Sequence, residues 1–321
     1  MMEIRIWQFG SDDKYISSFL KGMAIAHNQP TRNIDWFRWK FEQSPYGKAI
    51  LSCSFDGDKV AGCVAYGRGV VKYKGKNWKC ALSYETFVHP DYQGQGLFKK
   101  LISLAEQEMK KEGIQFLYNF PNTNSITGFK HMNWICRNDI RVFRIKLCHP
   151  LRVLWNFSKM RQSFTPAPSN LSVLKDLYVP ELPLPSISPD IINPLWTKEY
   201  IQWRFFTHPN REYLVCDNDR CFSVSMVGSR GGLKSVHILY ASAKDNRGTE
   251  FVMDEVIKYI KQRAHPDLIE YASTVMDRSL NKVFGFIKVP AHGNFCYKIL
   301  DDDMQMDEFK IVLPSINAHT Y

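Results

Sequence analysis

The chain has 321 residues, of which 45% are apolar and 14% aromatic, and this is enough to build two hydrophobic cores. Such a composition excludes an intrinsically disordered chain. No apolar run approaches the roughly 20 residues that a membrane-spanning helix needs, so no membrane span is expected. The N-terminal residues alternate like a β-strand and lack the apolar segment of a signal peptide.

Lysine and arginine outnumber aspartate and glutamate by 42 to 32, which gives a formal net charge of +10. A basic excess favours acidic ligands, such as nucleic acid, a membrane face, or a polyphosphate cofactor with an acidic substrate. The basic residues form no long block and no DNA-binding motif, so we expect no nucleic-acid partner. An ordinary solvated basic surface explains the excess equally well.

The eight cysteines are scattered and lie mostly inside apolar stretches. They form no CxxC pair and have no zinc-binding spacing with histidine, so they are predicted to be buried thiols in a reducing cytoplasm. The nine histidines form no HExxH or other metal pattern, so no metal site is expected. The cysteines are Cys53, Cys63, Cys80, Cys136, Cys148, Cys216, Cys221 and Cys296.

The N-terminal third predicts a strand over 3–7, a helix that opens near 11–13, and an aromatic-rich helix over 35–41. The aromatic residues are expected to pack this helix into a core. The alternative is that they form one wall of the site that binds the acceptor. Turn residues then separate two pairs of strands, over 49–54 with 59–66 and over 70–73 with 78–88.

A glycine-containing loop follows the last of these strands, over residues 87–98. Gly94 and Gly96 carry no Cβ, so the backbone there can approach a ligand closely. The helix that begins at Leu97 points its first unpaired N–H groups at the same place, which suits a phosphate. Phe98 falls on the apolar face of this helix, together with Leu97, Leu101, Ile102, Ala105 and Met109.

This loop resembles the acyl-CoA-binding motif of the GNAT acetyltransferase superfamily, Gln/Arg-x-x-Gly-x-Gly/Ala. Gln93 and Gly96 occupy the first two fixed positions, and Phe98 stands at the third. The next strand, over 114–120, leads into a segment over 121–134 that is similar to the Pro-Asn-x-x-Ser-x-x-Gly-Phe form of a bacterial GNAT subgroup, which is often linked to cell-surface sugar biosynthesis. The order of strands, loop, helix, strand and Asn/Ser helix strengthens the resemblance.

The chain repeats itself at an offset of 164 residues, because Trp39-Lys40-Phe41 recurs as Trp203-Arg204-Phe205. The resemblance therefore implies an α/β (α+β) protein with two GNAT-like domains, each a mixed, mostly antiparallel sheet flanked by helices. The predicted boundaries are 1–147 for the catalytic domain, 148–190 for a proline-rich connector and 191–321 for a degenerate second domain.

The second half has Asp245-Asn246-Arg247-Gly248 where the first has Gln93-Gly94-Gln95-Gly96. We therefore expect the second half to wall the acceptor cleft, with a phosphate contact as the alternative.

The resemblance implies an enzyme, an N-acetyltransferase that moves an acetyl group from acetyl-CoA to a primary amine of a small molecule by direct attack. An amino sugar or a sugar nucleotide is the acceptor that the subgroup suggests. The expected acetyl-CoA-binding residues are Phe87, Val88, Gln93, Gly94, Gln95, Gly96, Leu97, Phe98, Asn124, Ser125 and Phe129.

The acceptor amine must lose a proton, and Glu85 is the best-placed carboxylate to take it. Strand alternation puts Glu85 on the face of Phe87 and opposite Tyr84. The acid that reprotonates the thiolate is often a tyrosine in GNAT enzymes, but the matching position here is Phe129, so Tyr84, Tyr118, His131 or water are the candidates. Two alternatives stay open for the base: Glu85 as a purely structural carboxylate, and the C-terminal carboxylate of Tyr321.

Two other functions stay open. The chain could be a non-catalytic tandem GNAT that binds CoA or another ligand, or an aminoacyl transferase of the peptidoglycan-bridge type that uses charged tRNA. The sequence does not fix the oligomeric state, and a homodimer is one candidate.

Overall fold

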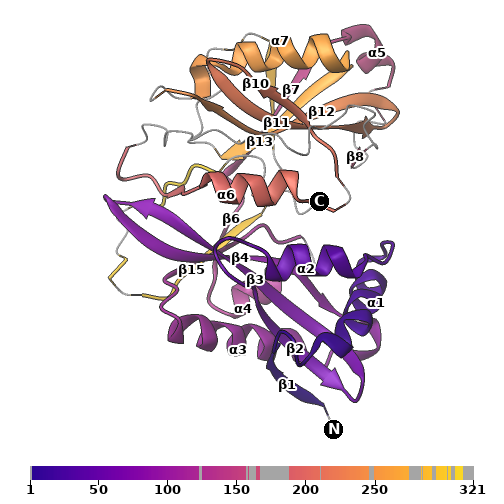
Figure 1. The fold of residues 1–321 in the computed structure, drawn as a ribbon, viewed down its shortest axis with the longest axis vertical. Helices are drawn as coiled ribbons and strands as arrows, with labels where there is room; N and C mark the ends of the chain where they lie inside the picture. Colours follow the sequence, from indigo (N-terminus) through magenta and orange to yellow (C-terminus); the bar gives the residue numbers. More distant parts are fainter. Residues whose placement is uncertain are drawn as a thin grey trace. The chain divides into compact units, whose positions relative to one another are not determined.

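The computed structural model describes residues 2–122, 125–156, 158, 164–166, 188–209, 211–245, 249–274, 283, 285–290, 294–301, 303–304 and 308–313. The chain divides into two compact units, Met1–Asn138 with Gly293–Phe309 and Asp139–His292 with Lys310–Tyr321. Each unit is built on a mostly antiparallel sheet flanked by helices, as expected (Figure 1). We call them the first and the second unit.

The elements of the first unit are β1 (Glu3–Ile6), η1 (Asp13–Tyr15), α1 (Ile16–His27), α2 (Ile34–Glu42), β2 (Ile50–Asp56), β3 (Lys59–Tyr73), β4 (Lys76–Val88), η2 (Pro90–Tyr92), α3 (Leu97–Lys111), β5 (Phe116–Asn119), α4 (Ile126–His131), β6 (Ile135–Arg137) and β15 (Phe295–Ile299). Their strands pair in the order β1-β2-β3-β4-β5-β15-β6, and only the β4–β5 pair is parallel. The two strands predicted over 59–66 and 70–73 are one strand, β3. Gly67 and Gly69 stay in the ladder there, opposite Leu82 and Cys80 of β4.

Helices cover both faces of this first sheet. The apolar face of α3 and the ring of Phe129 from α4 pack on Val64, Tyr66 and Leu117 of the sheet. The other face carries an aromatic layer in which Phe19 of α1 contacts the rings of Trp7, Phe37, Phe41 and Phe87. The aromatic side chains of α2 are at most 1% exposed, which confirms the predicted core role of that helix.

The elements of the second unit are β7 (Arg141–Leu147), α5 (Pro150–Trp155), β8 (Thr165–Pro166), β9 (Asn193–Pro194), α6 (Lys198–Ile201), the π-helical η4 (Gln202–Phe206), β10 (Leu214–Asp217), β11 (Cys221–Arg230), β12 (Leu233–Ala243), η5 (Thr249–Phe251), α7 (Met253–Ala264), β13 (Leu268–Thr274) and β14 (Phe286–Pro290). The sheet order is β10-β11-β12-β13-β7-β14, and the β12–β13 pair is parallel.

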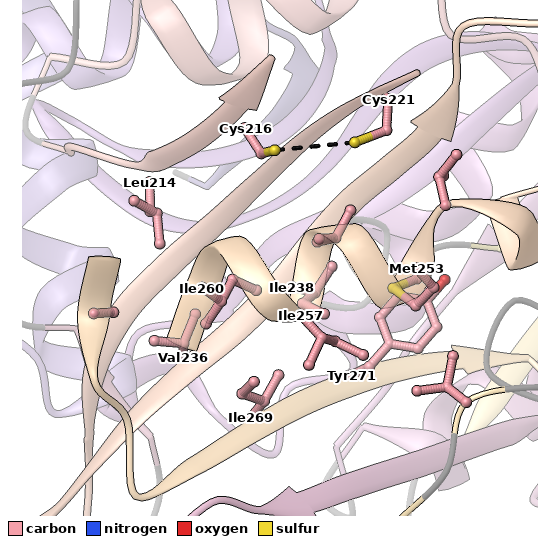
Figure 2. Packing of buried hydrophobic residues seen from close by; sticks show 14 of the residues in the cluster. Leu214, Cys216, Cys221, Val236, Ile238, Met253, Ile257, Ile260, Ile269 and Tyr271 are labelled. Atoms are coloured by element: carbon pink, nitrogen blue, oxygen red, sulfur yellow. Dashed lines mark hydrogen bonds between the residues drawn. The ribbon is translucent and has the colours of Figure 1, made fainter. Parts of the chain in front are cut away.

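Figure 2 shows the core beneath α7, where Ile257 and Ile260 face Val236, Ile238 and Ile269 of the sheet. At one side of this core the Cys216 and Cys221 thiols lie 3.9 Å apart (Figure 2). No helix in the described ranges is long and apolar enough to cross a membrane.

Strands from each half of the chain belong to the sheet of the other half, and β9 of the second half also pairs with β3 of the first sheet. Strand β7 pairs with β13 and β14 of the second unit, and β15 inserts between β5 and β6 of the first (Figure 1). The structure therefore divides the chain after residue 138, not at the predicted boundary of 147, and returns residues 293–309 to the first unit. Periodicity identifies a strand but does not select its partner, which explains the difference. Most of the predicted connector, residues 159–163 and 167–187, lies outside the described residues.

The returning strand is bonded covalently to its neighbour. Cys136 of β6 and Cys296 of β15 are directly opposite in the ladder and form a disulfide. The prediction that all eight cysteines are thiols is wrong for these two, because residues 160 apart in sequence become cross-strand partners only through the strand exchange. The described free thiols are those of Cys53, Cys63, Cys80, Cys148, Cys216 and Cys221.

Replacing both cysteines (Cys136→Ser with Cys296→Ser) is expected to lower the free energy of unfolding by about 2–5 kcal/mol, because the bond closes a long loop in the unfolded chain. Urea unfolding with and without a reductant measures this difference. The reductant should destabilise the wild type and leave the double variant unchanged. Equal stability of wild type and double variant in both conditions would contradict a disulfide that holds β15 in place.

Candidate functional site

The first sheet opens between β4 and β5. The two strands pair only where Cys80–Ser83 lie beside Phe116–Asn119, and β5 then ends. Beyond Ser83, no described strand pairs with β4 on that side. An extended ligand can therefore lie along β4 where a neighbouring strand would, although the carbonyls of Thr86 and Val88 already accept from His27 Nε2 at 3.0 Å and Gln93 Nε2 at 3.2 Å.

A β-bulge lies at the start of this opening. The register between β3 and β4 shifts between Cys63, which faces Phe87, and Ala65, which faces Tyr84. Glu85 lies in the bulge with φ +49, in the left-handed region that non-glycine residues rarely adopt. Strain of this kind costs of order 1–3 kcal/mol and is concentrated at functional sites.

Because of the bulge, the side chains of Tyr84 and Glu85 are not oriented as the sequence predicts. Simple alternation puts their side chains on opposite faces, but both contact Lys40 of α2. Lys40 Nζ lies 3.8 Å from Glu85 Oε1 and 4.6 Å from the centre of the Tyr84 ring. The Tyr84 hydroxyl donates to the backbone carbonyl of Lys40 at 3.4 Å, and the Tyr84 ring stacks on Phe41 at 6.0 Å. Sequence reasoning missed Lys40, although a cation inside an aromatic helix was the available signal.

Glu85 is well enclosed but poorly bonded. Its side chain is 11% exposed, and that of Lys40 is 6% exposed. In the part of the chain that the structure describes, the Glu85 carboxylate accepts no hydrogen bond and makes only the 3.8 Å contact. A carboxylate in this state keeps its oxygens available to take a proton from a ligand.

Tyr118 lies on β5, opposite Leu82 of β4 and Tyr297 of β15. It is 5% exposed, and its ring is stacked with Phe116 at 5.7 Å and with Phe295 at 6.4 Å. Tyr118 therefore flanks the last paired residues before the opening. The structure brings Tyr84 and Glu85 together around Lys40 and holds Tyr118 on the adjacent strand.

The glycine loop lies beyond the open end of β4. Gly94 and Gly96 have φ of +76 and +71, and a Cβ on either would meet nothing within 4 Å. The glycines are therefore needed for backbone conformation, and the space above them is open. Gln93 turns its amide back to the Val88 carbonyl at 3.2 Å, and residues 93–96 are exposed.

The helix after the loop begins without a cap. Gly96 is the N-cap of α3 and supplies no side-chain hydrogen bond, whereas Asn33 caps α2 by accepting from Trp36 N at 2.9 Å. The first turn of α3 carries no acidic residue, and Lys99 and Lys100 are exposed there. Unpaired N–H groups, the positive end of the helix dipole and two lysines all favour an anionic ligand.

Comparison with known proteins agrees with this geometry. Residues 12–134 match a family model described as an acetyltransferase (GNAT) domain. This part of the chain is a GNAT domain. No curated protein matches the sequence.

Solved structures extend the likeness to most of the chain. A GCN5-related N-acetyltransferase from Anabaena variabilis superimposes with a TM-score of 0.59 at 11% identity, over 93% of this chain and 73% of that chain. A probable N-acyltransferase from Enterococcus faecalis gives 0.57 at 9% identity, over 93% and 73%. N-myristoyltransferase from Saccharomyces cerevisiae, with bound myristoyl-CoA, gives 0.52 at 11% identity, over 92% and 78%. At these identities the likeness concerns the fold.

The aromatic residue at the third motif position is accommodated inside the GNAT domain. Phe98 packs edge-to-face on Phe129 at 5.4 Å, away from the loop, as its helical spacing predicts. A Cβ on Gly128 would lie 2.4 Å from the Phe98 ring, so Gly128 leaves the space that this ring fills. Phe129 is fully buried between Phe98 and Trp134, so its side chain serves the core.

The Asn/Ser segment has a local structural role. Asn122 Oδ1 accepts from the backbone N–H of Ser125 at 2.9 Å and from its hydroxyl at 3.0 Å, which fixes the entry to α4. Asn124 and Tyr321, predicted for the cofactor site and as an alternative base, lie outside the described residues. Within the described ranges, no group of three or more His, Cys, Asp or Glu side chains is placed to hold a metal ion.

Replacing Gly67 by alanine should displace the Tyr84 ring, because the new Cβ would lie 2.4 Å from Tyr84 Cε1. We expect the free energy of unfolding to fall by about 1–3 kcal/mol. Gly69→Ala is the matched control on the same strand, since its Cβ would meet only Cys80 Sγ at 3.2 Å. Denaturant unfolding of both variants tests this, and an unchanged Gly67→Ala would contradict the position of Tyr84.

Proposed function

We propose that the protein is an N-acetyltransferase that transfers the acetyl group of acetyl-CoA to a primary amine of a small molecule by direct attack. The observation that carries this proposal is the opening between β4 and β5, which begins at the Glu85 bulge and leads to the glycine loop. A place for a thioester, a candidate base and a place for phosphates thus follow one another along β4 and the loop after it.

The chain offers each part of acetyl-CoA a chemically suited partner. The pyrophosphate fits the uncapped N-terminus of α3, with Gly94 and Gly96 allowing close approach and Lys99 and Lys100 adding positive charge. The pantetheine arm contains amides, which can bond to backbone groups of β4 over 85–88, where no described strand lies alongside; the Thr86 and Val88 carbonyls would have to exchange their contacts with His27 and Gln93. We assign the predicted residues Phe87, Val88 and Gln93 to Leu97 to this site.

The proposed reaction needs no nucleophilic side chain. The neutral amine nitrogen attacks the thioester carbonyl carbon, the C–S bond breaks, and the nitrogen proton passes to the Glu85 carboxylate directly or through water. A backbone N–H of the β4 edge stabilises the developing oxyanion, an effect of about 3 kcal/mol for one donor. Tyr84 and Tyr118 are the candidate donors to the departing thiolate.

The second unit supports a tandem arrangement in which only the first unit is catalytic. Its order β10-β11-β12-β13, with α7 between the parallel pair, repeats the order β2-β3-β4-β5 with α3. Strand β12 contains no carboxylate, whereas β4 contains Glu85. We therefore propose that the second unit is a degenerate copy of the GNAT fold. The net charge of +10 favours an acidic acceptor, such as a sugar nucleotide.

Isothermal titration with acetyl-CoA and release of free CoA with a panel of amines test the proposal. Glu85→Gln should lower kcat by about 10²–10⁴-fold without changing the Kd for acetyl-CoA, because it removes the base and leaves the binding edge intact. Absence of acetyl-CoA binding by the wild type would refute the proposal. Binding without CoA release for any amino sugar, sugar nucleotide or polyamine would favour a non-catalytic ligand-binding protein.

Gly96→Ala tests the loop separately. The left-handed φ of Gly96 costs an alanine about 1–2 kcal/mol, so the loop should relax and acetyl-CoA affinity should fall about 5- to 30-fold. Gly75→Ala is a matched control in the β3–β4 turn, because Gly75 has φ +75 and equally open surroundings. Both variants should lose similar stability, but only Gly96→Ala should lose affinity in titration calorimetry. Equal affinities of the two would remove the loop from the site.

A further inference from the structure

Helix α2 contains a buried cation among buried aromatic residues. Lys40 is 5% exposed, while its neighbours Trp36, Trp39 and Phe41 are at most 1% exposed. Taking an ammonium group out of water costs several kcal/mol, and a well-packed apolar residue is often equally stable at such a position. The charge of Lys40 therefore calls for an explanation beyond packing.

Lys40 contacts two residues at the β4 bulge. Its ammonium faces Glu85 at 3.8 Å and the Tyr84 ring at 4.6 Å, and its backbone carbonyl accepts from the Tyr84 hydroxyl. One residue thus contacts both side chains that the proposed reaction uses. Helix α2 is itself held by its Asn33 cap and its aromatic core, so Lys40 extends from a rigid element.

We infer that Lys40 is a positioning residue, whose charge orients the Glu85 carboxylate at the mouth of the β4–β5 opening. This inference rests on the proposed acetyl transfer. In that reaction the proton of the acceptor amine passes to Glu85, and Lys40 is no proton donor or acceptor. The separation of 3.8 Å is an ion-pair contact longer than a hydrogen bond, so neither oxygen of Glu85 is consumed by Lys40.

The internal repeat is consistent with a role that depends on Glu85. Arg204 occupies the equivalent position in the second unit and is also buried, at 8% exposed. The corresponding strand β12 carries no carboxylate. A cation is retained in both copies, and in the first copy it lies 3.8 Å from the β4 carboxylate of Glu85.

Four variants separate positioning from a purely structural role. Lys40→Met removes the charge and keeps the length, Lys40→Arg keeps the charge, and Lys40→Met with Glu85→Gln removes both partners. Arg38→Met is the matched control, because it removes ion pairs of the same helix, to Asp13 at 3.0 Å and to Glu42 at 3.4 Å, that do not involve β4. For each variant kcat, the acceptor KM, the acetyl-CoA Kd and the melting temperature are measured.

We expect Lys40→Met to lower kcat about 10- to 100-fold with unchanged acetyl-CoA Kd, because a misplaced base loses the reactive geometry. Lys40→Arg should restore most of this loss, and Arg38→Met should retain wild-type kcat. The double variant should be no slower than Glu85→Gln alone, since Lys40 acts through Glu85. Lys40→Gln serves the same comparison if Lys40→Met does not fold.

Wild-type kcat in the uncharged Lys40 variants, or a loss that adds fully to that of Glu85→Gln, would overturn the inference. Equal losses in Lys40→Arg and Lys40→Met would also overturn it, because they would reflect packing. Failure of the proposed function looks different, since the wild type itself would then show no acetyl-CoA binding or CoA release.

Discussion

The geometry of the site depends on the short length of the ladder between β4 and β5. Their parallel ladder covers only four residues of each strand, and β4 continues beyond it with no described strand alongside. Backbone groups in a sheet need partners, so an edge that starts in the core and faces no strand is a binding surface for an extended ligand. The bulge lies on this part of β4, and the glycine loop and the uncapped α3 follow it in the chain.

Two enclosed glutamates, Glu270 and Glu85, differ in how many hydrogen bonds their carboxylates accept. Glu270 in the second unit is fully buried and accepts two hydrogen bonds from Arg230, at 2.8 and 2.7 Å, and one from Ser235 at 2.5 Å. Such a saturated network fixes structure. Glu85 has one long ion-pair contact and a strained backbone. Because Glu85 has few bonding partners, its carboxylate oxygens can accept a proton from a ligand.

The exchange of β7 and β15 links the two halves of the chain at the level of their sheets. Strand β15 pairs with β5, which carries Tyr118, so the C-terminal half helps to build the sheet of the GNAT domain. The disulfide from Cys136 to Cys296 secures this insertion. A GNAT domain cut from the chain at residue 147 would therefore lack the strand that lies between β5 and β6 in its own sheet.

The sequence by itself determined the local features of this protein. Gly94 and Gly96, the amphipathic pattern after Leu97 and the aromatic helix around Trp39 correctly located the loop, α3 and the packed face of α2, because backbone freedom and side-chain period are local properties. The same patterns placed Phe98 on the core side, where Gly128 makes room for it. Glu85 was identified as a carboxylate near the loop, but its strained conformation was not.

Only the tertiary structure decided which distant residues meet. The contact of Lys40 with Glu85 joins a helix to a strand 45 positions later, and the Cys136–Cys296 bond joins strands 160 residues apart. Alternation failed at Tyr84 and Glu85 because a bulge inserts one residue into the ladder, and no residue pattern marked where the register would shift. Register, strand partners and buried ion pairs depend on long-range packing, which the periodicity of a single segment does not encode.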